Sequence, residues 1–405
     1  MKVTLLHYAA PPVVGGVESV IGHHARLLAD DGRSVAILAG RGEQVDPRVP
    51  FLHLPEADSR HPEVMAVKAE LDVGRVTPRF EALVAGLLAS LEVLLAGADV
   101  VVAHNVASLN KNLALTAALK RFGENKTALR LVLWHHDLAW TTPRYRDELY
   151  GGYPWDLLRT AWSGAVQVTI SEARRRELVD LLRIPAESIQ VVPNGVDVAQ
   201  FLKLEPASRS LLDQLDLLSA TPLLLLPVRI TERKNIELAI RTLAVLRSQF
   251  PAARLVVTGP LGPHNPANMA YFRQLKALRS ELEVQGGVVF LAELSDETLP
   301  DAVIADLYRL ADALFLPSRE EGFGIPLLEA GLAGLPVFCA DIPPLRDLGG
   351  EYATYFEPDA NPYTIAGLIR DRLIRNRSYG LRQLVKKDYT WSHIYRERIR
   401  PLLDA

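Results

Sequence analysis

Two glutamates in one short stretch are the first candidates for chemistry. Glu321 and Glu329 lie in SREEGFGIPLLEAGLAGLP (318–336), with Gly322 and Gly324 between them. Paired carboxylates roughly 5–9.5 Å apart can hydrolyse a glycosidic bond. Glycines entering a helix instead allow close backbone approach, and the free N–H groups and dipole of a helix start favour an anion. A third interpretation makes Glu321 a helix cap and Glu329 a solvated acid, and the spacing alone leaves all three open.

Pro326 predicts where the helix in this stretch begins. Proline is favoured in the first helical turn, so a helix is expected to start near Ile325. Glu329 would then lie about one turn into the helix, on an apolar-flanked side where a carboxylate needs hydroxyl or amide partners. A diol such as a ribose would supply them.

A basic loop forms the second candidate. In PVRITERKN (227–235), Arg229 and Lys234 follow a predicted strand and precede a predicted helix. The two side chains could converge on a diphosphate, with the arginine binding through its fork and the lysine acting as a point charge. The alternative is a solvated surface pair. The loop belongs to the same half of the chain and the same predicted sheet edge as the glycine stretch, which favours the phosphate interpretation.

A histidine doublet lies in the first half of the chain. LVLWHHDLAW (131–140) ends a predicted strand with His135, His136 and Asp137. Adjacent strand residues point to opposite faces, so at most one imidazole is expected in a site, the alternative being one core and one surface histidine. The chain contains no HExxH and no Asp-x-Asp motif, so we expect no metal.

Gly15 and Gly16 lie between the first predicted strand and helix, in PPVVGGVES (11–19). The stretch lacks the full G-x-G-x-x-G spacing, so it does not predict a dinucleotide site. It is either a tight turn or a place where backbone N–H groups reach a ligand.

The elements that must position these residues alternate along the chain. Short β-branched apolar runs predict strands, and amphipathic stretches such as 17–30, followed by Gly32, predict helices between them. The predicted strands are 3–8, 34–40, 99–105, 129–136, 165–170 and 188–193, then 222–228, 253–259, 288–293, 312–318 and 335–340. This alternation predicts an α/β fold with parallel sheets covered by helices on both faces.

The chain length and one polar segment divide the fold into two. The 405 residues exceed one ordinary core, and the segment 194–222 begins with the turn signal Asn194-Gly195 and lacks a strand pattern through much of its length. We therefore expect two doubly wound domains joined there. Ligands of open α/β sheets bind beyond the carboxyl ends of the strands, so the site is expected in a cleft between the domains.

The composition excludes several other classes of protein. A net charge of −3, without a basic stripe, does not indicate nucleic-acid binding. The single cysteine, Cys339, excludes an internal disulfide framework, and no apolar run reaches the ~18 residues of a membrane span. We expect a cytoplasmic protein, with peripheral contact to a membrane left open. The sequence does not indicate an oligomeric state.

Taken together, these motifs resemble the retaining glycosyltransferases of family 4, which have the GT-B fold of two Rossmann-like domains. SREEGFGIPLLEAGLAGLP resembles the family's E-x7-E element, and GGVE, HHD, VTISE, VVPNGVD, the R-x4-K pair, VVTGP and VVFLAEL follow in the family's order. The resemblance implies an N-terminal, acceptor-side domain over 1–200 and a C-terminal, donor-side domain over 201–385. It also implies that 386–405 is a C-terminal helix packed on the N-terminal domain.

The resemblance implies roles for individual residues. Arg229 and Lys234 would bind the donor diphosphate, Glu329 the ribose hydroxyls and Glu321 the donor sugar. The backbones of Gly16, Phe323, Gly324, Ile325 and Leu294 would complete the donor site. His136 would contact the transferring sugar, with His135 as the alternative because the doublet leaves the register ambiguous. The catalytic set is therefore His136, Glu321, Arg229 and Lys234.

The implied reaction moves a hexose from a nucleoside diphosphate sugar to a hydroxyl acceptor, with retention and without a metal or other cofactor. The acceptor would be a sugar, a polyol or a lipid-linked molecule, and Arg144, Arg146 and Lys111 are the acceptor-side candidates. The alternatives are a GT-B sugar-nucleotide epimerase and a catalytically degenerate GT-B binding subunit. One departure from the family is Val228, where a glycine often precedes the arginine of R-x4-K.

Overall fold

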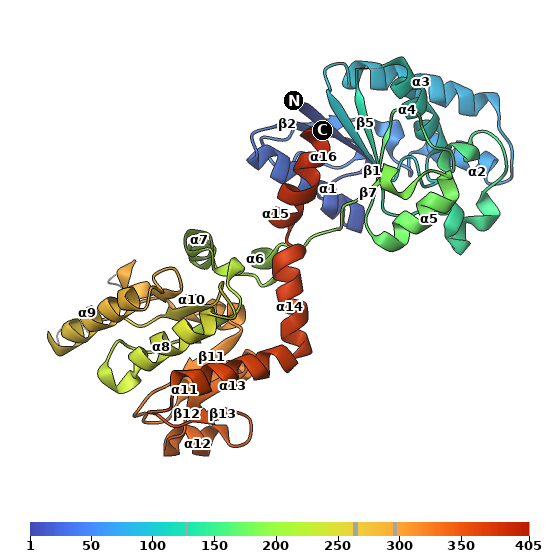
Figure 1. Ribbon diagram of the computed structural model, residues 1–405. Helices are drawn as coiled ribbons and strands as arrows, with labels where there is room; N and C mark the ends of the chain where they lie inside the picture. Colours follow the sequence, from blue (N-terminus) through green and yellow to red (C-terminus); the bar gives the residue numbers. More distant parts are fainter. Residues whose placement is uncertain (127, 262–265, 295–297, 405) are drawn as a thin grey trace. The chain divides into compact units, whose positions relative to one another are not determined.

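The computed structural model describes residues 1–126, 128–261, 266–294 and 298–404. The chain divides into two compact units, each considered by itself below (Figure 1). Unit 1 comprises Met1–Gly195 with Trp391–Ala405, and unit 2 comprises Val196–Thr390. The division at 195/196 lies close to the predicted one at 200/201. The return to unit 1 comes at 390/391, inside the predicted terminal segment 386–405.

Unit 1 is built on a sheet of seven parallel strands in the order β3-β2-β1-β4-β5-β6-β7. The strands are β1 (Lys2–Ala9), β2 (Ser34–Arg41), β3 (Phe51–His53), β4 (Val100–His104), β5 (Arg130–His135), β6 (Val166–Thr169) and β7 (Ile189–Val191). The helices are α1 (Gly16–Asp30), α2 (Pro62–Leu71), α3 (Pro78–Leu94), α4 (Leu113–Asn125), α5 (Glu172–Leu182), α15 (Trp391–Ile394) and α16 (Arg400–Asp404), with a π-helical turn over Tyr395–Ile399.

The two faces of this sheet carry separate apolar cores, because successive strand residues point to opposite faces. Leu6, Leu38 and Val101 pack on one face with α3 and α4. The other face holds Val3, Leu5, Ile37, Val102 and Trp134, packed with α1 and with the last helical segment of the chain. That segment contributes Ile394, Tyr395, Ile399, Leu402 and Leu403 to the core.

Unit 2 repeats the architecture with six parallel strands in the order β10-β9-β8-β11-β12-β13. The strands are β8 (Leu223–Leu226), β9 (Arg254–Val257), β10 (Val288–Phe290), β11 (Ala313–Leu316), β12 (Val337–Ala340) and β13 (Thr354–Phe356). The helices are α6 (Val198–Phe201), α7 (Pro206–Leu215), α8 (Ile236–Arg247), α9 (Pro266–Glu281), α10 (Asp301–Leu310), α11 (Ile325–Leu332), α12 (Pro343–Gly349), α13 (Pro362–Arg375) and α14 (Arg377–Asp388).

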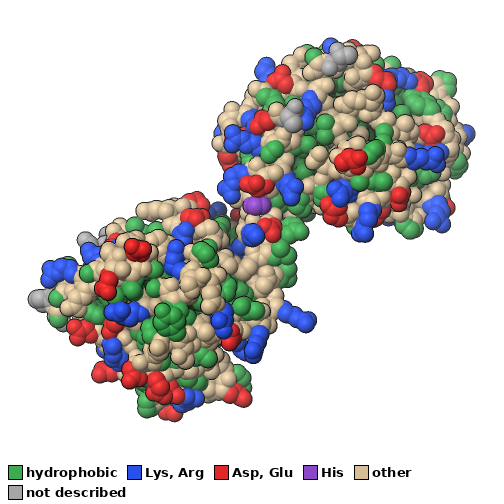
Figure 2. Space-filling view, in the orientation of Figure 1, with side chains coloured by type: hydrophobic (Ala, Val, Ile, Leu, Met, Phe, Trp, Pro, Cys, Tyr) green, Lys and Arg blue, Asp and Glu red, His purple; other side chains and the backbone are tan. Residues whose placement is uncertain are grey.

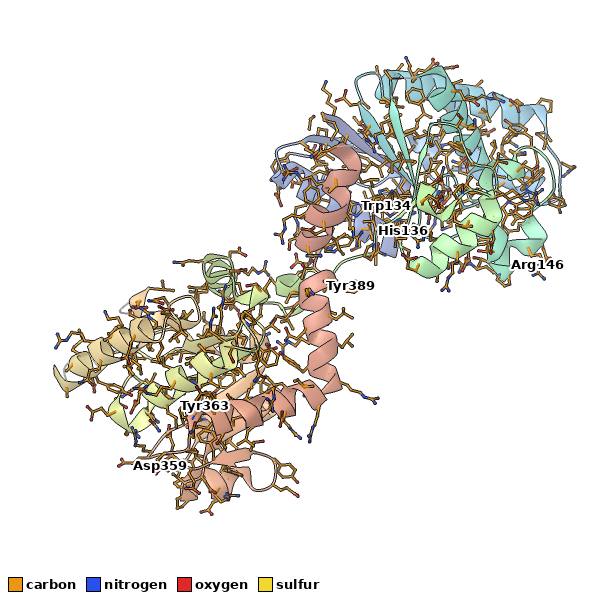
Figure 3. All side chains as sticks on the ribbon, viewed as in Figure 1. Trp134, His136, Arg146, Asp359, Tyr363 and Tyr389 are labelled. Atoms are coloured by element: carbon orange, nitrogen blue, oxygen red, sulfur yellow. The ribbon has the colours of Figure 1, made fainter. Side chains whose placement is uncertain are left out.

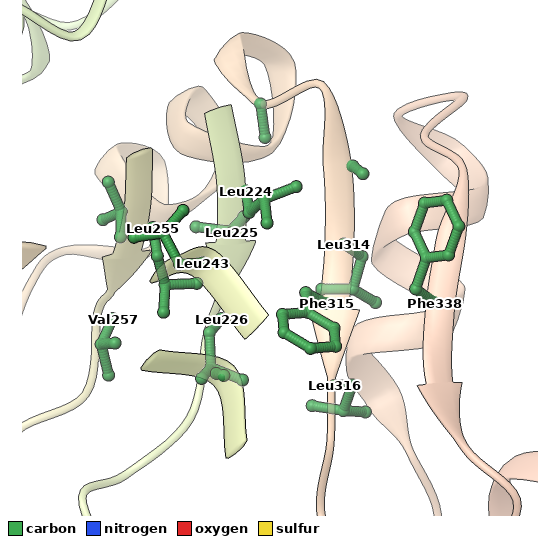
Figure 4. Close-up of a cluster of buried hydrophobic side chains, with 14 of the residues drawn as sticks. Leu224, Leu225, Leu226, Leu243, Leu255, Val257, Leu314, Phe315, Leu316 and Phe338 are labelled. Carbon is green, nitrogen blue, oxygen red and sulfur yellow. The ribbon is translucent and has the colours of Figure 1, made fainter. Parts of the chain in front are cut away.

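The central strands of unit 2 are completely buried. β8 and β11 read LLLL and ALFL, and every residue of both is buried. Figure 4 shows Leu224, Leu226 and Phe315 among the side chains of this core. Continuous apolar strands are expected where helices cover both faces of a parallel sheet. The predicted α/β class, with two doubly wound parallel sheets, is confirmed.

Acidic and basic side chains are interspersed over the visible face of each unit (Figure 2). No helix within the described residues is long and apolar enough to cross a membrane. At the start of unit 2, the N–H of Val196 donates to the carbonyl of Tyr389 at 2.8 Å, and Val196 forms an isolated parallel bridge with Thr390. The outgoing and returning segments are therefore tied together.

Candidate active site

In unit 2, the predicted phosphate-binding lysine and the predicted sugar-binding glutamate form an ion pair. Nζ of Lys234 lies 2.5 Å from Oε1 of Glu321, and each side chain is only 9% exposed. Lys234 ends a 3-10 turn (Glu232–Lys234) after β8, and Glu321 follows β11. β8 and β11 are neighbours in the sheet, so the loops after their carboxyl ends meet. The sequence placed both residues at one sheet edge but did not predict their pairing.

Backbone and side-chain bonds hold the turn that carries Lys234. The N–H of Arg319 donates to the carbonyl of Arg233 at 2.8 Å, and the Arg319 guanidinium lies 3.2 Å from the carbonyl of Glu232 and 2.8 Å from the carboxylate of Glu237. Asn235 then ends the turn with φ +53°. Sequence reasoning missed Arg319, although its place between a strand end and a candidate carboxylate is a usable signal.

The glycine loop leads into α11 where proline predicted the helix to start. Gly324 is the N-cap with φ +102°, a conformation that favours glycine, and a Cβ there would lie 2.7 Å from Cδ2 of Leu345, which would have to shift. The side chains of Phe323 and Ile325 are exposed beside it. A helix start with an uncapped first turn suits an anion, because its N–H groups point outward and its dipole is positive there.

Arg229 and Leu294 lie in loops after other strands of the same sheet. Arg229 follows β8 and is exposed. A Cβ on Gly259, in the loop after β9, would lie 1.8 Å from the carbonyl oxygen of Val228, so only glycine allows these two loops to approach so closely. Leu294 follows β10 and is exposed. The cation of Arg229 is therefore on the surface, unlike that of Lys234.

Glu329 lines a cavity of about 470 Å³ between α10 and α11. Asp301, Tyr308 and Leu332 are among its other lining residues. The hydroxyl of Tyr308 is buried and has no hydrogen-bond partner among the described residues. Burial raises the pKa of this phenol, and the neighbouring Glu329 carboxylate raises it further. The second glutamate therefore faces a cavity that could take a hydroxyl-bearing ligand, whereas the first is already paired.

In unit 1, His136, labelled in Figure 3, is buried, and so are His7, His24 and His104. Nδ1 of His104 lies 3.0 Å from Nε2 of His136, and the two rings stack with centroids 5.3 Å apart. His7 bonds through Nδ1 to the carbonyl of His104 at 2.7 Å, and the His24 ring lies 5.5 Å from that of His104. The pKa of His24 and of His136 is lowered to about 3, mainly by burial and to a smaller extent by the neighbouring histidines. These imidazoles are therefore neutral near pH 7.

Asn105 fixes the backbone beneath His136. Its Oδ1 accepts from the N–H of His136 at 2.7 Å and from that of Asp137 at 3.1 Å. Asn105 has φ +58°, a conformation that asparagine tolerates better than most residues, and its carbonyl accepts from the hydroxyl of Tyr8 at 3.1 Å. One buried side chain thus orients the HHD turn, and no motif in the sequence pointed to Asn105.

His135 points into a different environment. Its Nε2 lies 2.8 Å from Oε1 of Gln167 on the neighbouring strand β6, and burial lowers its pKa to about 4. The opposite orientations of His135 and His136 match the predicted alternation. His136 is therefore the member of the doublet that joins the histidine group at the end of β4.

The remaining unit 1 candidates lie in the segments that follow β1, β4 and β5. Gly16 is the first residue of α1, and a Cβ there would meet nothing within 4 Å. Lys111 is exposed and near enough to His7 to lower the pKa of that imidazole. Arg144 bonds to the hydroxyl of Tyr145 at 2.9 Å, whereas Arg146 lines a small cavity of about 190 Å³ with Thr141 and Thr142. Across the residues that the structure describes, no group of three or more His, Cys, Asp or Glu side chains could hold a metal.

Both units match known family profiles. The profile described as glycosyl transferases group 1 matches residues 212–387, and the one described as glycosyltransferase family 4 matches residues 14–200. The chain belongs to the group 1 glycosyltransferases. The first match contains the Lys234–Glu321 pair and the second contains His136, so both candidate regions lie inside the matched residues.

Curated relatives are moderately similar. A D-inositol 3-phosphate glycosyltransferase of Kineococcus radiotolerans is 32% identical over 222 residues, which cover 51% of this chain and 48% of that protein. An uncharacterized glycosyltransferase of Methanocaldococcus jannaschii is 28% identical over 270 residues, 63% of this chain and 64% of that protein. The matches thus span about half to two thirds of these relatives. A solved sucrose-phosphate synthase of Thermosynechococcus elongatus is 16% identical, with a TM-score of 0.38, over 100% of this chain and 98% of its own.

Proposed function

We propose that this protein transfers a hexose from a nucleoside diphosphate sugar to a hydroxyl acceptor, with retention of anomeric configuration and without a metal. The observation that carries the proposal is the buried Lys234–Glu321 pair beside an uncapped helix start. A buried ammonium, outward N–H groups and a carboxylate are the groups needed to bind a diphosphate and a sugar hydroxyl at one place.

The charge of the leaving group decides the donor-side roles. When the glycosidic bond breaks, negative charge grows on the departing diphosphate, and fixed cations aimed at it lower the barrier. Lys234 supplies one such cation, and Arg229, exposed on the same loop, supplies the second. Glu321 then accepts from a sugar hydroxyl, and Glu329 binds the ribose from the side of its cavity. These cations take the place that a divalent metal has in other sugar-nucleotide enzymes.

His136 contributes a neutral polar group from unit 1. Because burial keeps its imidazole uncharged, His136 can bind a sugar oxygen without adding a positive charge near the reacting carbon. Front-face displacement, in which the leaving phosphate helps deprotonate the acceptor hydroxyl, fits a site where no carboxylate is needed as nucleophile. We propose a cytoplasmic location, where nucleotide sugars are available.

The acceptor is proposed to be a polyol or sugar that carries an anionic group. Lys111, Arg144 and Arg146 are exposed cations in the segments after β4 and β5, and such side chains bind carboxylate or phosphate. The relative from Kineococcus radiotolerans is named for a phosphorylated polyol, which supports this choice. Lipid-linked acceptors are the other class to test.

A product analysis tests the function directly. The purified protein is incubated with labelled nucleoside diphosphate hexoses and a panel of phosphorylated and plain polyols, with EDTA present, and the product is identified by NMR. We expect an α-linked product from an α-linked donor. Isomerised nucleotide sugar formed without an acceptor would indicate an epimerase, and tight donor binding without turnover would indicate a binding subunit.

Arg229→Ala provides the matched variant. The side chain is exposed, so the fold should remain intact, whereas removing one leaving-group contact should lower kcat/KM on the order of 100-fold. Transfer at the parent rate by Arg229→Ala would contradict the leaving-group role. Arg247→Ala is the control. Arg247 also belongs to unit 2, but its guanidinium donates to the carbonyl of Ala253 and has no proposed role in donor binding.

A further inference from the structure

The contact between His104 and His136 contains information about where the protons lie. The two nitrogens lie 3.0 Å apart and both imidazoles are neutral, so only one of these two nitrogens carries a proton. One ring therefore donates the hydrogen bond and the other accepts it. The pair is enclosed, since His104 is fully buried and His136 is 5% exposed. Which ring donates decides which group His136 offers to a ligand.

The surroundings of His104 favour one arrangement. Its Nε2 is buried and has no hydrogen-bond partner among the described residues. If His104 carried its proton on Nε2, a buried N–H would be left without an acceptor, at a cost of about 1–3 kcal/mol. With the proton on Nδ1, only a lone pair is orphaned, and unpaired acceptors are tolerated better than unpaired donors. His104 therefore donates from Nδ1 to Nε2 of His136.

This arrangement sets the tautomer of the second ring. Because Nε2 of His136 accepts, the proton of its neutral imidazole must reside on Nδ1. Nδ1 of His136 makes no hydrogen bond within the described part of the chain, so it is the nitrogen left for a ligand. Asn105 holds the backbone of His136 and fixes the direction of the ring.

We propose that His104 is a positioning residue that holds His136 as the Nδ1–H tautomer, so that His136 presents an N–H donor to an oxygen of the donor sugar. The functional half of this inference rests on the proposed function, whereas the tautomer does not. Burial keeps the pair neutral, because it lowers the pKa of both imidazoles. His104 acts only through His136.

The tautomer can be measured without any enzymatic activity. Long-range ¹H–¹⁵N correlation spectra of ¹⁵N-histidine-labelled protein at pH 7.5 separate protonated from unprotonated ring nitrogens, and His136→Gln assigns the signals of His136. We expect a protonated Nδ1 and an unprotonated Nε2 in the parent. A parent spectrum with the proton of His136 on Nε2 would overturn the proposal.

Two substitutions of similar size test whether His104 acts through the hydrogen bond from its Nδ1 or only by filling space. His104→Asn places an amide N–H close to the original Nδ1 and should preserve the tautomer of His136. His104→Gln places its amide near the original Nε2 and should release His136 toward the Nε2–H form that imidazole favours in water. For transfer, we expect kcat to fall at least tenfold in His104→Gln with donor KM within twofold, and His104→Asn to recover most of it.

His24→Leu is the structural control. His24 is buried, lies against the rings of His104 and Trp134, and its Nε2 has no hydrogen-bond partner among the described residues. Its loss should lower stability without changing the tautomer of His136. An unchanged tautomer in His104→Gln, or equal kcat losses in His104→Asn and His104→Gln, would overturn the positioning role. A correct tautomer series in a protein without transfer would refute the proposed function instead.

Discussion

The two candidate regions lie at equivalent edges of two similar parallel sheets, but one consists of neutral polar side chains and the other of charged ones. In unit 1, the carboxyl ends of β1, β4 and β5 carry buried imidazoles that are neutral and bonded to one another. In unit 2, the carboxyl ends of β8 and β11 carry a buried ammonium–carboxylate pair and an uncapped helix start. The difference shows that one architecture can pre-organise either dipoles or charges.

The two kinds of site are sensitive to different perturbations. A network of neutral buried histidines is sensitive to proton concentration, because protonation places charge where water is absent. A buried ion pair is sensitive to removal of either partner, because the remaining charge loses its compensation. A change of pH should therefore affect mainly unit 1, and a single substitution in the ion pair should affect mainly unit 2.

Acidification should give the largest effect, and it should fall on unit 1. Burial lowers the pKa of His7, His24 and His136 to about 3 and that of His135 to about 4, from 6.5. Below pH 6.5 the unfolded chain therefore takes up these protons first, so stability falls with pH until the folded-state pKa values are reached. Each such histidine should lower the free energy of unfolding by up to roughly 1.4 kcal/mol per pH unit in this range.

Tryptophan fluorescence isolates this effect. All five tryptophans lie in unit 1, at positions 134, 140, 155, 162 and 391. Urea unfolding between pH 7.5 and 5 should show the fluorescence transition move to much lower urea than the far-UV transition of unit 2. A parallel shift of both transitions would contradict the assignment of the acid-labile groups to unit 1.

Breaking the ion pair should give the next largest effect, confined to unit 2. Lys234→Met leaves the Glu321 carboxylate buried without a partner and should cost about 3–5 kcal/mol of unfolding free energy. It should also abolish thermal stabilisation by nucleoside diphosphates. Lys234→Met combined with Glu321→Gln should recover most of the stability and none of the binding. A coupling energy near zero in this double-mutant cycle would show that the pair contributes nothing.

The smallest effect is expected from substitution of Arg319, the exposed side chain that holds the turn of Lys234. Arg319 is 49% exposed and bonds to Glu237, which is 30% exposed, so Arg319→Met should cost less than about 1 kcal/mol. Because Arg319 also holds the turn of Lys234, diphosphate affinity should fall about 2–5-fold. Arg346 has the same exposure and pairs with Asp341, so Arg346→Met is a matched control in calorimetric titration. Equal affinity losses in both variants would remove the positioning role of Arg319.

The sequence predicted the repetitive parts of this structure well. The alternation of apolar runs and amphipathic stretches identified eleven of the strands, and Pro326 identified the start of α11. These features depend on local periodicity, which a single sequence displays directly. The strands β3 (Phe51–His53) and β13 (Thr354–Phe356) were missed. Three residues carry little pattern by themselves, and the equally short β7 and β10 were predicted because each lies in a longer run, SIQVVP and VVFLAE.

The contacts that organise each site could not be predicted in the same way. Lys234 and Glu321 are 87 residues apart, and His104 and His136 are 32 apart. Their pairing follows from strand order and from side-chain rotamers, neither of which the spacing of residues in one sequence contains. Asn105 shows the limit most clearly, since a buried amide and an ordinary loop asparagine look identical in the sequence. The roles of all these residues in catalysis stay predictions.

The discontinuous composition of unit 1 has a consequence for how the chain is made. Residues 196–390 are contiguous, so unit 2 can close as soon as its own last strand and helices leave the ribosome. Unit 1 lacks Ile394, Tyr395, Ile399, Leu402 and Leu403 until synthesis has passed all of unit 2, and the apolar face beside α1 stays uncovered meanwhile. The second half of the protein is therefore able to mature before the first, and a nascent chain halted before residue 391 should present a natural chaperone substrate.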